Sequence, residues 1–134
     1  MKTVLIDYTE EYYSNTAKTL LPDRRAGKFV QLRNNKTEYL VFSPKELSPY
    51  HADIIERFCR QKGIAGVYNR AHKSFEIHEP EWVIIGGGKF EIDKKQKYIR
   101  LYDDSMAYGK FESEGLLKRI LQIAGLKGYK ISIE

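Results

Sequence analysis

A histidine stands at the start of a predicted helix in the sequence "SPYHADIIERFC", residues 48–59. Ser48 is a favourable N-cap residue and Pro49 suits the first helical position, so His51 is expected to be the third residue of the helix. The N–H groups at that end have no partner within the helix, and the helix dipole there favours anions and a neutral imidazole. A neutral imidazole beside an anion can attack phosphorus or deprotonate a water molecule. His51 is therefore a candidate for phosphoryl chemistry.

The same histidine has a simpler interpretation. It precedes Ile54, Ile55 and Phe58 at helical spacing, and these residues form the apolar stripe of the helix. A histidine at the edge of this stripe can be a core residue that bonds locally, and the helix pattern taken alone favours that interpretation. Asp53 is most simply a favourable charge in the first turn, with an orienting role for His51 as the alternative.

A second stretch with phosphate-binding chemistry is "DDSMAYGKF", residues 103–111, between a predicted strand and a predicted helix. Ser105, Ala107 and Gly109 are small, so the backbone can approach a ligand closely, and successive N–H groups in such a turn can surround an anion. The Ser105 hydroxyl adds a donor. A compact connection between strand and helix explains the same residues equally well, and the spacing of a Walker loop is absent.

Three consecutive glycines, Gly86 to Gly88, interrupt a predicted strand just before Lys89. Glycines inside a strand indicate a bulge or the close approach of another backbone segment. Their spacing does not match a dinucleotide-binding fingerprint. Lys89 and Lys28 can contact phosphate as point charges. In a chain with 23 basic residues, however, a single lysine is more often simply solvated.

Three motifs together carry a family resemblance: "YHADI" before a helix, then "GGGK", then "SMAYG". From about residue 28 to the C-terminus, the chain resembles the phosphohistidine phosphatase family, also called the Janus/Ocnus family. The resemblance implies that phosphate is removed from a phosphohistidine-containing protein, without a metal ion or another cofactor. It also implies a small α/β domain with a mixed sheet of about six strands and two helices.

The resemblance also implies roles for individual residues. The catalytic histidine of the family falls on His51, as nucleophile or general base, and a lysine of its first matched strand falls on Lys28. Where animal members typically carry arginine after the glycines, this chain has Lys89, which keeps the charge but cannot bind phosphate bidentately. The phosphate-binding loop of the family falls on Ser105, Met106 and Ala107 as backbone donors, followed by Tyr108 and Gly109. Tyr50 and Tyr108 are candidates for the walls of the site, with ordinary aromatic packing as the alternative.

The elements that must position these residues are typical of an α+β domain. Cys59 completes the apolar stripe of the first helix, and Gly63 ends that helix. A second helix is expected from Ser113, with Leu116, Leu117, Ile120, Leu121 and Ala124 on one face. Alternating apolar residues predict strands at 2–7, 28–34, 38–43, 82–93, 97–103 and 129–134, and a hairpin within 66–78. We therefore predict a mixed sheet of about six strands with two helices packed on it.

We expect residues 1–134 to form a single domain. Residues 1–26 match no part of the family, and we expect a strand followed by a loop there. Residues 64–80 are longer than the usual connection in the family, and we interpret the excess as an inserted hairpin at the rim of the site. Either segment could change which protein substrate docks.

Composition limits the class of protein. The net charge of +5 favours anionic partners, and the single cysteine excludes an internal disulfide; we expect Cys59 to be buried and inert. Because no apolar run is long enough to span a membrane and the N-terminus does not resemble a signal peptide, we expect a cytoplasmic monomer without a membrane partner. Only "DKKQKYIR" resembles a nucleic-acid-binding stretch, and it fits a solvated turn and strand equally well, so no nucleic-acid partner is expected.

Two alternatives concern metal and turnover. His72 and His78 are evenly spaced in a predicted strand near Glu76, but a cysteine pair and a H-x-x-x-H motif are absent, so we expect no metal site. The primary hypothesis is a metal-independent protein histidine phosphatase that acts on phosphohistidine, with phospholysine as an open second substrate. The alternative is a regulatory module that binds a phosphorylated protein without turnover, because the same loop would hold phosphate in either case.

Overall fold

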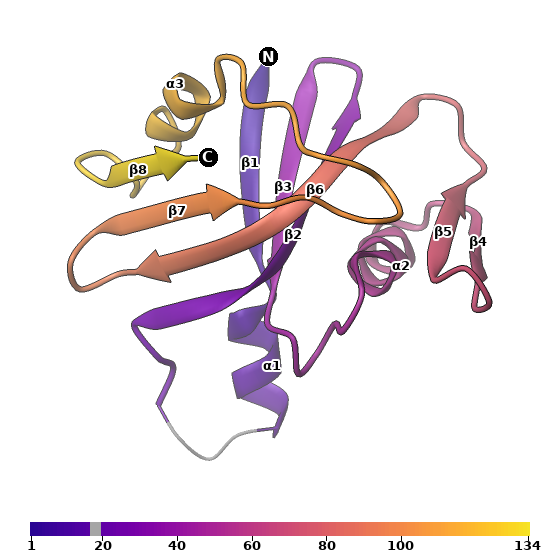
Figure 1. Cartoon of the computed structure of the whole chain (residues 1–134), viewed down its shortest axis with the longest axis horizontal. Helices are drawn as coiled ribbons and strands as arrows, with labels where there is room; N and C mark the ends of the chain where they lie inside the picture. The colour runs from indigo at the N-terminus through magenta and orange to yellow at the C-terminus, as the bar shows by residue number, and fades with distance from the viewer. Residues whose placement is uncertain (17–19) are drawn as a thin grey trace.

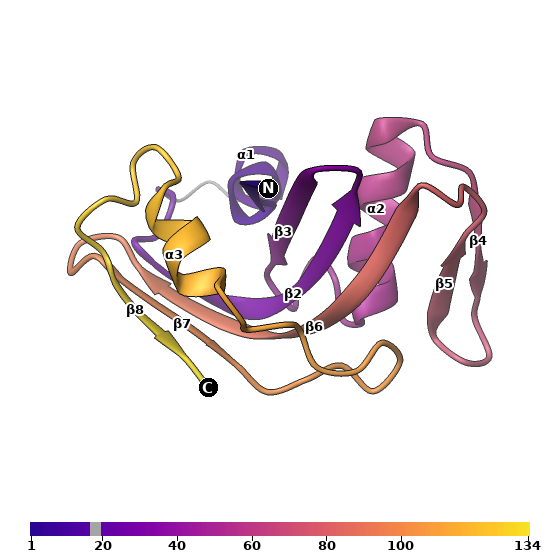
Figure 2. The ribbon, with the colours of Figure 1, turned by 90° about the horizontal axis from the view of Figure 1, so that it is seen from above.

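A curled six-stranded sheet forms the body of the protein, and a separate two-stranded hairpin lies to one side (Figures 1 and 2). The computed structural model describes residues 1–16 and 20–134, with the side chains of 1–14 and 20–134. The strands are β1 (Lys2–Asp7), β2 (Arg24–Asn34), β3 (Thr37–Ser43), β4 (Gly66–Asn69), β5 (Ser74–Ile77), β6 (Trp82–Asp93), β7 (Tyr98–Tyr102) and β8 (Lys130–Ile133). The helices are α1 (Thr9–Thr16), α2 (His51–Lys62) and α3 (Leu116–Leu121). The predicted α+β class with a mixed sheet is therefore confirmed.

The sheet has the order β1-β3-β2-β6-β7-β8, in which the four inner strands are antiparallel. The two edge strands run parallel to their neighbours, β1 to β3 and β8 to β7. The N-terminal segment is thus part of the sheet rather than an appendage. The long strands β2 and β6 pair along almost their whole length at the centre of the sheet, and this antiparallel pairing places Lys28 opposite Lys89.

Side chains alternate along a strand, so both faces of the sheet carry apolar residues. Each face is covered by its own core. Val30 points to a core that contains Ile54, Ile55 and Phe58 of α2. The preceding residue, Phe29, points to a second core that is closed by residues of α3. Phe29 and Val30 are both fully buried. The central strand therefore has a fixed register, since a slip of one residue would exchange the two faces.

Helix α2 carries the predicted apolar stripe and ends at Gly63, whose φ of 71° is left-handed, as predicted. Its start differs from the prediction. Tyr50, not Ser48, is the N-cap, so His51 is the first helical residue rather than the third. Ser48 lies in the turn after β3, where its hydroxyl accepts a hydrogen bond at 2.7 Å from the hydroxyl of Ser43, the last residue of that strand, instead of capping the helix. Instead the Asp53 carboxylate accepts the N–H of Tyr50 at 2.8 Å.

Two other helix predictions need correction. The helix expected from Ser113 begins only at Leu116, and its six residues turn Leu116 and Ile120 inward while Leu117 and Leu121 remain exposed. A helix of fewer than two turns can bury only such an i, i+4 pair. The segment after β1 was expected to be a loop but forms α1, where the Asp7 carboxylate accepts the N–H of Thr9 at 2.9 Å. The apolar periodicity of this segment is too weak to predict a helix.

The expected hairpin at 66–78 is present as β4 and β5, and lies beside α2 (Figure 1). Tyr68 of β4 and Phe75 of β5 pack against the core under α2. Among the described residues no helix has the length and apolar character needed to cross a membrane.

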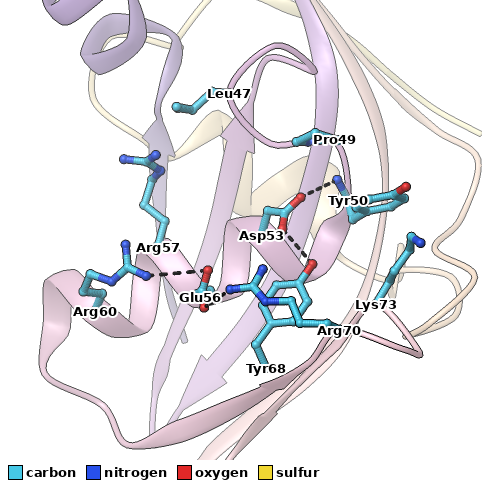
Figure 3. Close-up of a pocket in the computed structure, with 10 residues that line it drawn as sticks. All are labelled: Leu47, Pro49, Tyr50, Asp53, Glu56, Arg57, Arg60, Tyr68, Arg70 and Lys73. Carbon is cyan, nitrogen blue, oxygen red and sulfur yellow. Dashed lines mark hydrogen bonds and ion pairs between the residues drawn. The ribbon is translucent and has the colours of Figure 1, made fainter.

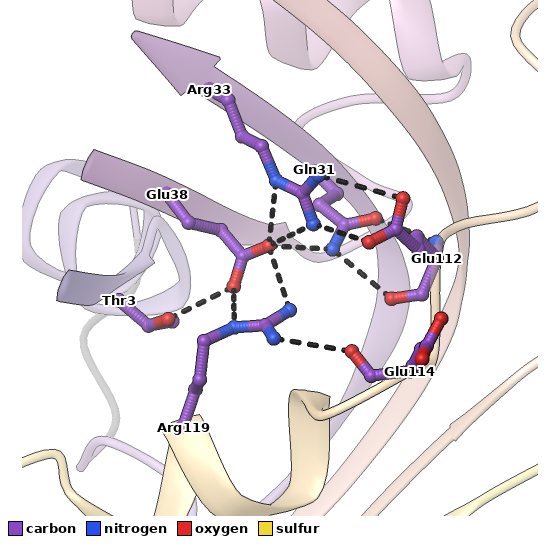
Figure 4. Close-up of polar contacts among 7 residues, drawn as sticks. All are labelled: Thr3, Gln31, Arg33, Glu38, Glu112, Glu114 and Arg119. Atoms are coloured by element: carbon purple, nitrogen blue, oxygen red, sulfur yellow. Dashed lines mark hydrogen bonds and ion pairs between the residues drawn. The ribbon is translucent and has the colours of Figure 1, made fainter. Parts of the chain in front are cut away.

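A buried carboxylate ties four elements together on the α3 side (Figure 4). Glu38 of β3 is fully buried and accepts hydrogen bonds from Thr3 of β1, from Gln31 and Arg33 of β2, and from Arg119 of α3. Burial acts to raise the pKa of Glu38, but the bonds from Arg119, Thr3, Arg33 and Gln31 outweigh it and hold that pKa below its ordinary value. The carboxylate is thus charged and matched by two guanidinium groups.

Candidate functional site

The site is centred on His51, the first residue of α2, which is only 8% exposed. Its ring atom Nε2 lies 3.0 Å from the carbonyl oxygen of Gly88 on β6. Because a carbonyl oxygen only accepts, this contact requires a proton on Nε2 and leaves the lone pair of the neutral ring on Nδ1. Burial lowers the pKa of His51, and the Lys28 ammonium lowers it further against the opposing effect of the Gly88 bond. The neutral, basic imidazole is therefore the favoured form.

The glycines of β6 make room for this arrangement. A methyl group on Gly87 would lie 2.8 Å from Cδ2 of His51, and one on Gly86 would lie 2.4 Å from the carbonyl oxygen of Lys110. The pairing of β2 with β6 also shifts between Gln31 and Leu32, opposite the start of the glycines. Both the bulge and the close backbone approach predicted for this stretch are confirmed.

The loop 105–109 is closed on itself and held against β6. The carbonyl of Ser105 accepts the N–H of Gly109 at 2.7 Å, and the carbonyl of Gly109 accepts the N–H groups of Ser105 and Gly87, both at 3.1 Å. Among the described residues, the N–H groups of Met106 and Ala107 have no protein acceptor. The N–H of Ser105 is occupied, and the hydroxyl, which accepts from the N–H of Tyr108, is the donor that Ser105 can still offer.

A pocket of about 530 Å³ brings most of the predicted site residues together. The predicted residues that line it are Lys28, Tyr50, His51, Lys89, Ser105, Met106 and Ala107. Tyr108 and Gly109 are not among the lining residues. Tyr108 instead points to the hairpin, where its hydroxyl accepts the N–H of Phe75 at 2.6 Å and donates to the carbonyl of Phe75 at 3.0 Å. Through these bonds and those of the Gly109 backbone, both residues hold the loop in place.

Two lysines on neighbouring strands supply positive charge, since Lys28 of β2 pairs with Lys89 of β6 in the sheet. The Lys28 ammonium donates to the carbonyl of Pro49 at 2.7 Å, just before the helix that carries His51. Burial lowers the pKa of Lys28, with further lowering from Lys45 and Lys89. This mutual repulsion marks a local excess of positive charge, which an anion would relieve.

Sequence reasoning missed two carboxylates in the pocket, Asp103 and Asp104. Asp103 Oδ2 lies 3.1 Å from Nζ of Lys89, and this hydrogen bond lowers the pKa of Asp103. The backbone of Asp103 is left-handed, with a φ of 64°. Both residues directly precede "SMAYG", so their position beside the motif was the signal that could have identified them. An incoming phosphate would compete with Asp103 for Lys89.

The hairpin also contributes to the pocket, through His72 and Lys73. His72 lies in the turn before β5, whereas His78 follows β5 and its Nε2 lies 3.7 Å from Oε1 of Glu76. Within residues 1–16 and 20–134, no cluster of three His, Cys, Asp or Glu side chains is placed to ligate a metal. Cys59 lies buried in the stripe of α2, where burial raises the pKa of its thiol to about 11. That thiol is therefore protonated near neutral pH.

The arrangement of these groups is suited to reactions in which an anion is held beside a nucleophile or base. It combines a neutral imidazole, two unpaired backbone N–H groups, a hydroxyl and two ammonium groups around one pocket. Donors of this kind stabilise the oxygens of a tetrahedral or trigonal-bipyramidal anion, while the imidazole acts as nucleophile or base.

A family model described as the Janus/Ocnus family matches residues 28–124, which is more than half of the 134 residues. The match extends from β2 to just beyond α3 and contains every residue that lines the pocket. Strands β1 and β8 and helix α1 lie outside it. A search among curated proteins returns no match.

Proposed function

Because the chain belongs to the Janus/Ocnus family, we propose that it hydrolyses the phosphoramidate bond of phosphohistidine in proteins. Phospholysine contains the same type of bond and is a second substrate to test. The observation that carries the proposal is the position of His51, whose protonated Nε2 is bound to Gly88 while its ring lines a pocket with the free N–H groups of Met106 and Ala107. We also place the activity in the cytoplasm, where the single cysteine would stay reduced.

The reaction requires little beyond positioning, because the P–N bond is labile once the leaving imidazole is protonated. In one route, Nδ1 of His51 forms a bond to phosphorus as the P–N bond breaks, and the leaving imidazole takes up a proton from water. A water molecule then hydrolyses the phosphorylated His51. In the other route, Nδ1 removes a proton from water as that water attacks phosphorus and the P–N bond breaks, and the resulting imidazolium passes this proton to the leaving imidazole. Both routes return a neutral His51 and release inorganic phosphate without a metal ion.

Charge stabilisation comes from the groups around the imidazole. The N–H groups of Met106 and Ala107 and the Ser105 hydroxyl are suited to bind the nonbridging oxygens, as an oxyanion hole does. The Lys28 ammonium adds positive charge close to His51. Lys89 can add more when phosphate displaces it from Asp103. The positive end of the α2 dipole adds to this charge, because His51 is the first residue of the helix.

The direct test is release of inorganic phosphate from a phosphohistidine peptide, followed by phosphorus NMR with a chelator present. We expect rapid release by the wild-type protein and a loss of at least about two orders of magnitude in turnover for His51→Ala. The matched control is His72→Ala, which removes the other histidine of the pocket and is expected to retain turnover. Equal rates for wild type and His51→Ala, with both folded, would contradict the proposal.

A second function is a phosphoprotein-binding module without turnover. Lys89 stands where animal members of the family typically carry arginine, and its pairing with Asp103 at 3.1 Å leaves it poorly suited to orient a phosphoryl group for reaction, whereas the free N–H groups of Met106 and Ala107 would still bind phosphate. This module would bind the phosphorylated protein without hydrolysing its phosphoramidate bond. Phosphate-dependent shifts of the amide signals of residues 105–109, without phosphate release from the peptide, would support it over the phosphatase.

A further inference from the structure

A groove of about 490 Å³ lies between α2 and the β4–β5 hairpin (Figure 3). It is next to the 530 Å³ pocket around His51, which we call the phosphate pocket after its proposed ligand. Its lining combines aliphatic and aromatic surfaces with charged groups. Among the residues that line it are Tyr50, Asp53, Glu56, Arg60, Tyr68, Arg70 and Lys73. Tyr50 and Lys73 also line the phosphate pocket, so the two cavities adjoin one another and share a wall.

The groove is held in shape by contacts between its two sides. The Tyr68 hydroxyl donates to Asp53 Oδ1 at 2.7 Å, which ties β4 to the first turn of α2. The Arg70 guanidinium lies 3.9 Å from the centre of the Tyr68 ring and 3.4 Å from Glu56. A ligand would therefore meet a surface that is already formed, which lowers the entropic cost of binding.

Positive charge exceeds negative charge along the groove. Four basic residues line it, Arg57, Arg60, Arg70 and Lys73, against the two carboxylates of Asp53 and Glu56. Arg57 is also paired with Glu11, outside the groove, at 3.0 Å, so Arg60, Arg70 and Lys73 carry the excess.

Both carboxylates are already occupied. The oxygens of Asp53 accept from Tyr50 N–H and from the Tyr68 hydroxyl. Glu56 is shared between Arg60 at 3.6 Å and Arg70 at 3.4 Å, and the side chains of these arginines are 72% and 71% exposed.

Lys73 provides the link to the phosphate pocket. Its Nζ lies 4.9 Å from the centre of the Tyr50 ring, and no carboxylate of residues 1–14 or 20–134 forms an ion pair with it. Positive groups thus continue from the phosphate pocket, through Lys73, to the exposed Arg70 and Arg60. A substrate protein whose phosphorylated side chain occupies the phosphate pocket would place its neighbouring residues against these positive groups.

We propose that this groove binds an acidic segment of the substrate protein, adjacent in sequence to its phosphohistidine. The excess of positive charge selects Asp and Glu side chains, and the Tyr50 and Tyr68 rings give the backbone and methylene groups an apolar surface. The proposal rests on the proposed function for the identity of the phosphorylated group. The inserted hairpin would then be a specificity element, since it supplies Tyr68, Arg70 and Lys73.

Binding and turnover are tested separately, so that the two proposals can fail independently. Two peptides carry the same non-hydrolysable phosphonate analogue of phosphohistidine, one flanked by Asp and Glu and the other by Asn and Gln. Dissociation constants are measured by fluorescence anisotropy for wild type, for Arg60→Glu with Arg70→Glu, and for a control. The control is Lys118→Glu with Lys127→Glu, which makes the same change in net charge at exposed sites outside the groove.

We expect wild type to prefer the acidic peptide by about tenfold at low salt, with the preference falling as salt rises. The preference should vanish in the groove variant and persist in the control. Turnover of free phosphohistidine, which has no flanking chain, should be the same in all three proteins. Equal affinity of wild type for both peptides, or equal loss in the control, would overturn the docking inference.

Two further outcomes separate this inference from others. A preserved preference for the acidic peptide without any turnover would retain the groove and reject the phosphatase. Salt-sensitive binding of a single-stranded oligonucleotide that the groove variant loses, together with equal affinity for the two peptides, would reject the peptide in favour of nucleic acid.

Discussion

The Nε2 atom of His51 lies 3.0 Å from the carbonyl oxygen of Gly88, at the point where α2 begins and the glycine stretch of β6 passes beneath it. This contact decides which ring nitrogen carries the proton, and therefore which one can act on phosphorus. It depends on Gly87, because any larger residue there would occupy the space of the imidazole.

Gly87→Ala is therefore expected to displace the ring. The new methyl group would lie 2.8 Å from Cδ2 of His51 and 2.7 Å from the carbonyl oxygen of Phe29. We expect turnover of phosphohistidine to fall roughly 10- to 100-fold, since small displacements of a catalytic group have effects of this size. Overpacking should also lower the free energy of unfolding by about 1–3 kcal/mol, measured by urea denaturation.

Gly128→Ala is the matched control for that variant. Its φ of 90° strains any side chain, but no atom lies within 4 Å of the added methyl group. It should lose about 1 kcal/mol of stability and keep its turnover. A loss of turnover in Gly128→Ala equal to that in Gly87→Ala would mean that stability, and not the position of the ring, limits the reaction.

The pH dependence of turnover should follow the protonation of His51. Burial holds the pKa of His51 below its ordinary value, and protonation removes the lone pair of Nδ1. Turnover should therefore fall as the pH is lowered through this depressed pKa, with a midpoint below about 6.5. Because the Lys28 ammonium also lowers the pKa of His51, Lys28→Gln should move the midpoint to higher pH.

The same midpoints can be read without substrate from the ring-proton signals of His51 in NMR. A midpoint for His51 that stays unchanged in Lys28→Gln would show that the ammonium has no electrostatic influence on the ring.

The ion pair between Lys89 and Asp103 should weaken phosphate binding. In Asp103→Asn the Lys89 ammonium loses its carboxylate partner, and asparagine tolerates the left-handed backbone of this position. We expect inorganic phosphate to bind roughly two- to fivefold more tightly, as measured by calorimetry. Lys89→Ala should bind phosphate more weakly than wild type, and in Lys89→Ala the further change Asp103→Asn should have a smaller effect. A full effect of Asp103→Asn without Lys89 would contradict coupling through the ion pair.

The buried network around Glu38 should control stability rather than turnover. Glu38→Gln leaves Arg33 and Arg119 without their buried counter-charge, which we expect to cost about 3 kcal/mol of the free energy of unfolding. Turnover per folded molecule should be unchanged, because none of these residues lines the phosphate pocket. Glu114→Gln, at an exposed position beside the network, is the control and should be close to wild type.

Acid should act on the same carboxylate. Because the pKa of Glu38 is lower in the folded protein than in the unfolded chain, its contribution is complete above the unfolded pKa. That contribution is lost as the pH falls through the folded pKa. The stability of Glu38→Gln should therefore depend less on pH over this acidic range than that of wild type. Parallel pH profiles for the two proteins would exclude Glu38 as a source of acid sensitivity.

Local pattern was sufficient where one residue type dominates the local energy. Alternating apolar residues identified the strands, and the left-handed preference of glycine placed the end of α2 at Gly63. The three motifs identified the Janus/Ocnus family, and the resemblance named seven of the residues that line the pocket around His51. The glycines of β6 were correctly interpreted as the close approach of another backbone segment. The approach of the His51 ring to Gly87 was not predicted.

The order of residues along the chain is therefore enough to predict the set of chemical groups: an imidazole at the start of a helix, a small-residue loop and two lysines. Which atoms of these groups remain available depends on the fold, because distant segments compete for the same hydrogen-bond donors and acceptors. That competition removed Ser48 from the helix cap, occupied the N–H of Ser105 and paired Lys89 with Asp103. It also placed the hairpin against α2 through the bond between Tyr68 and Asp53, a contact between side chains 15 positions apart that no local pattern contains.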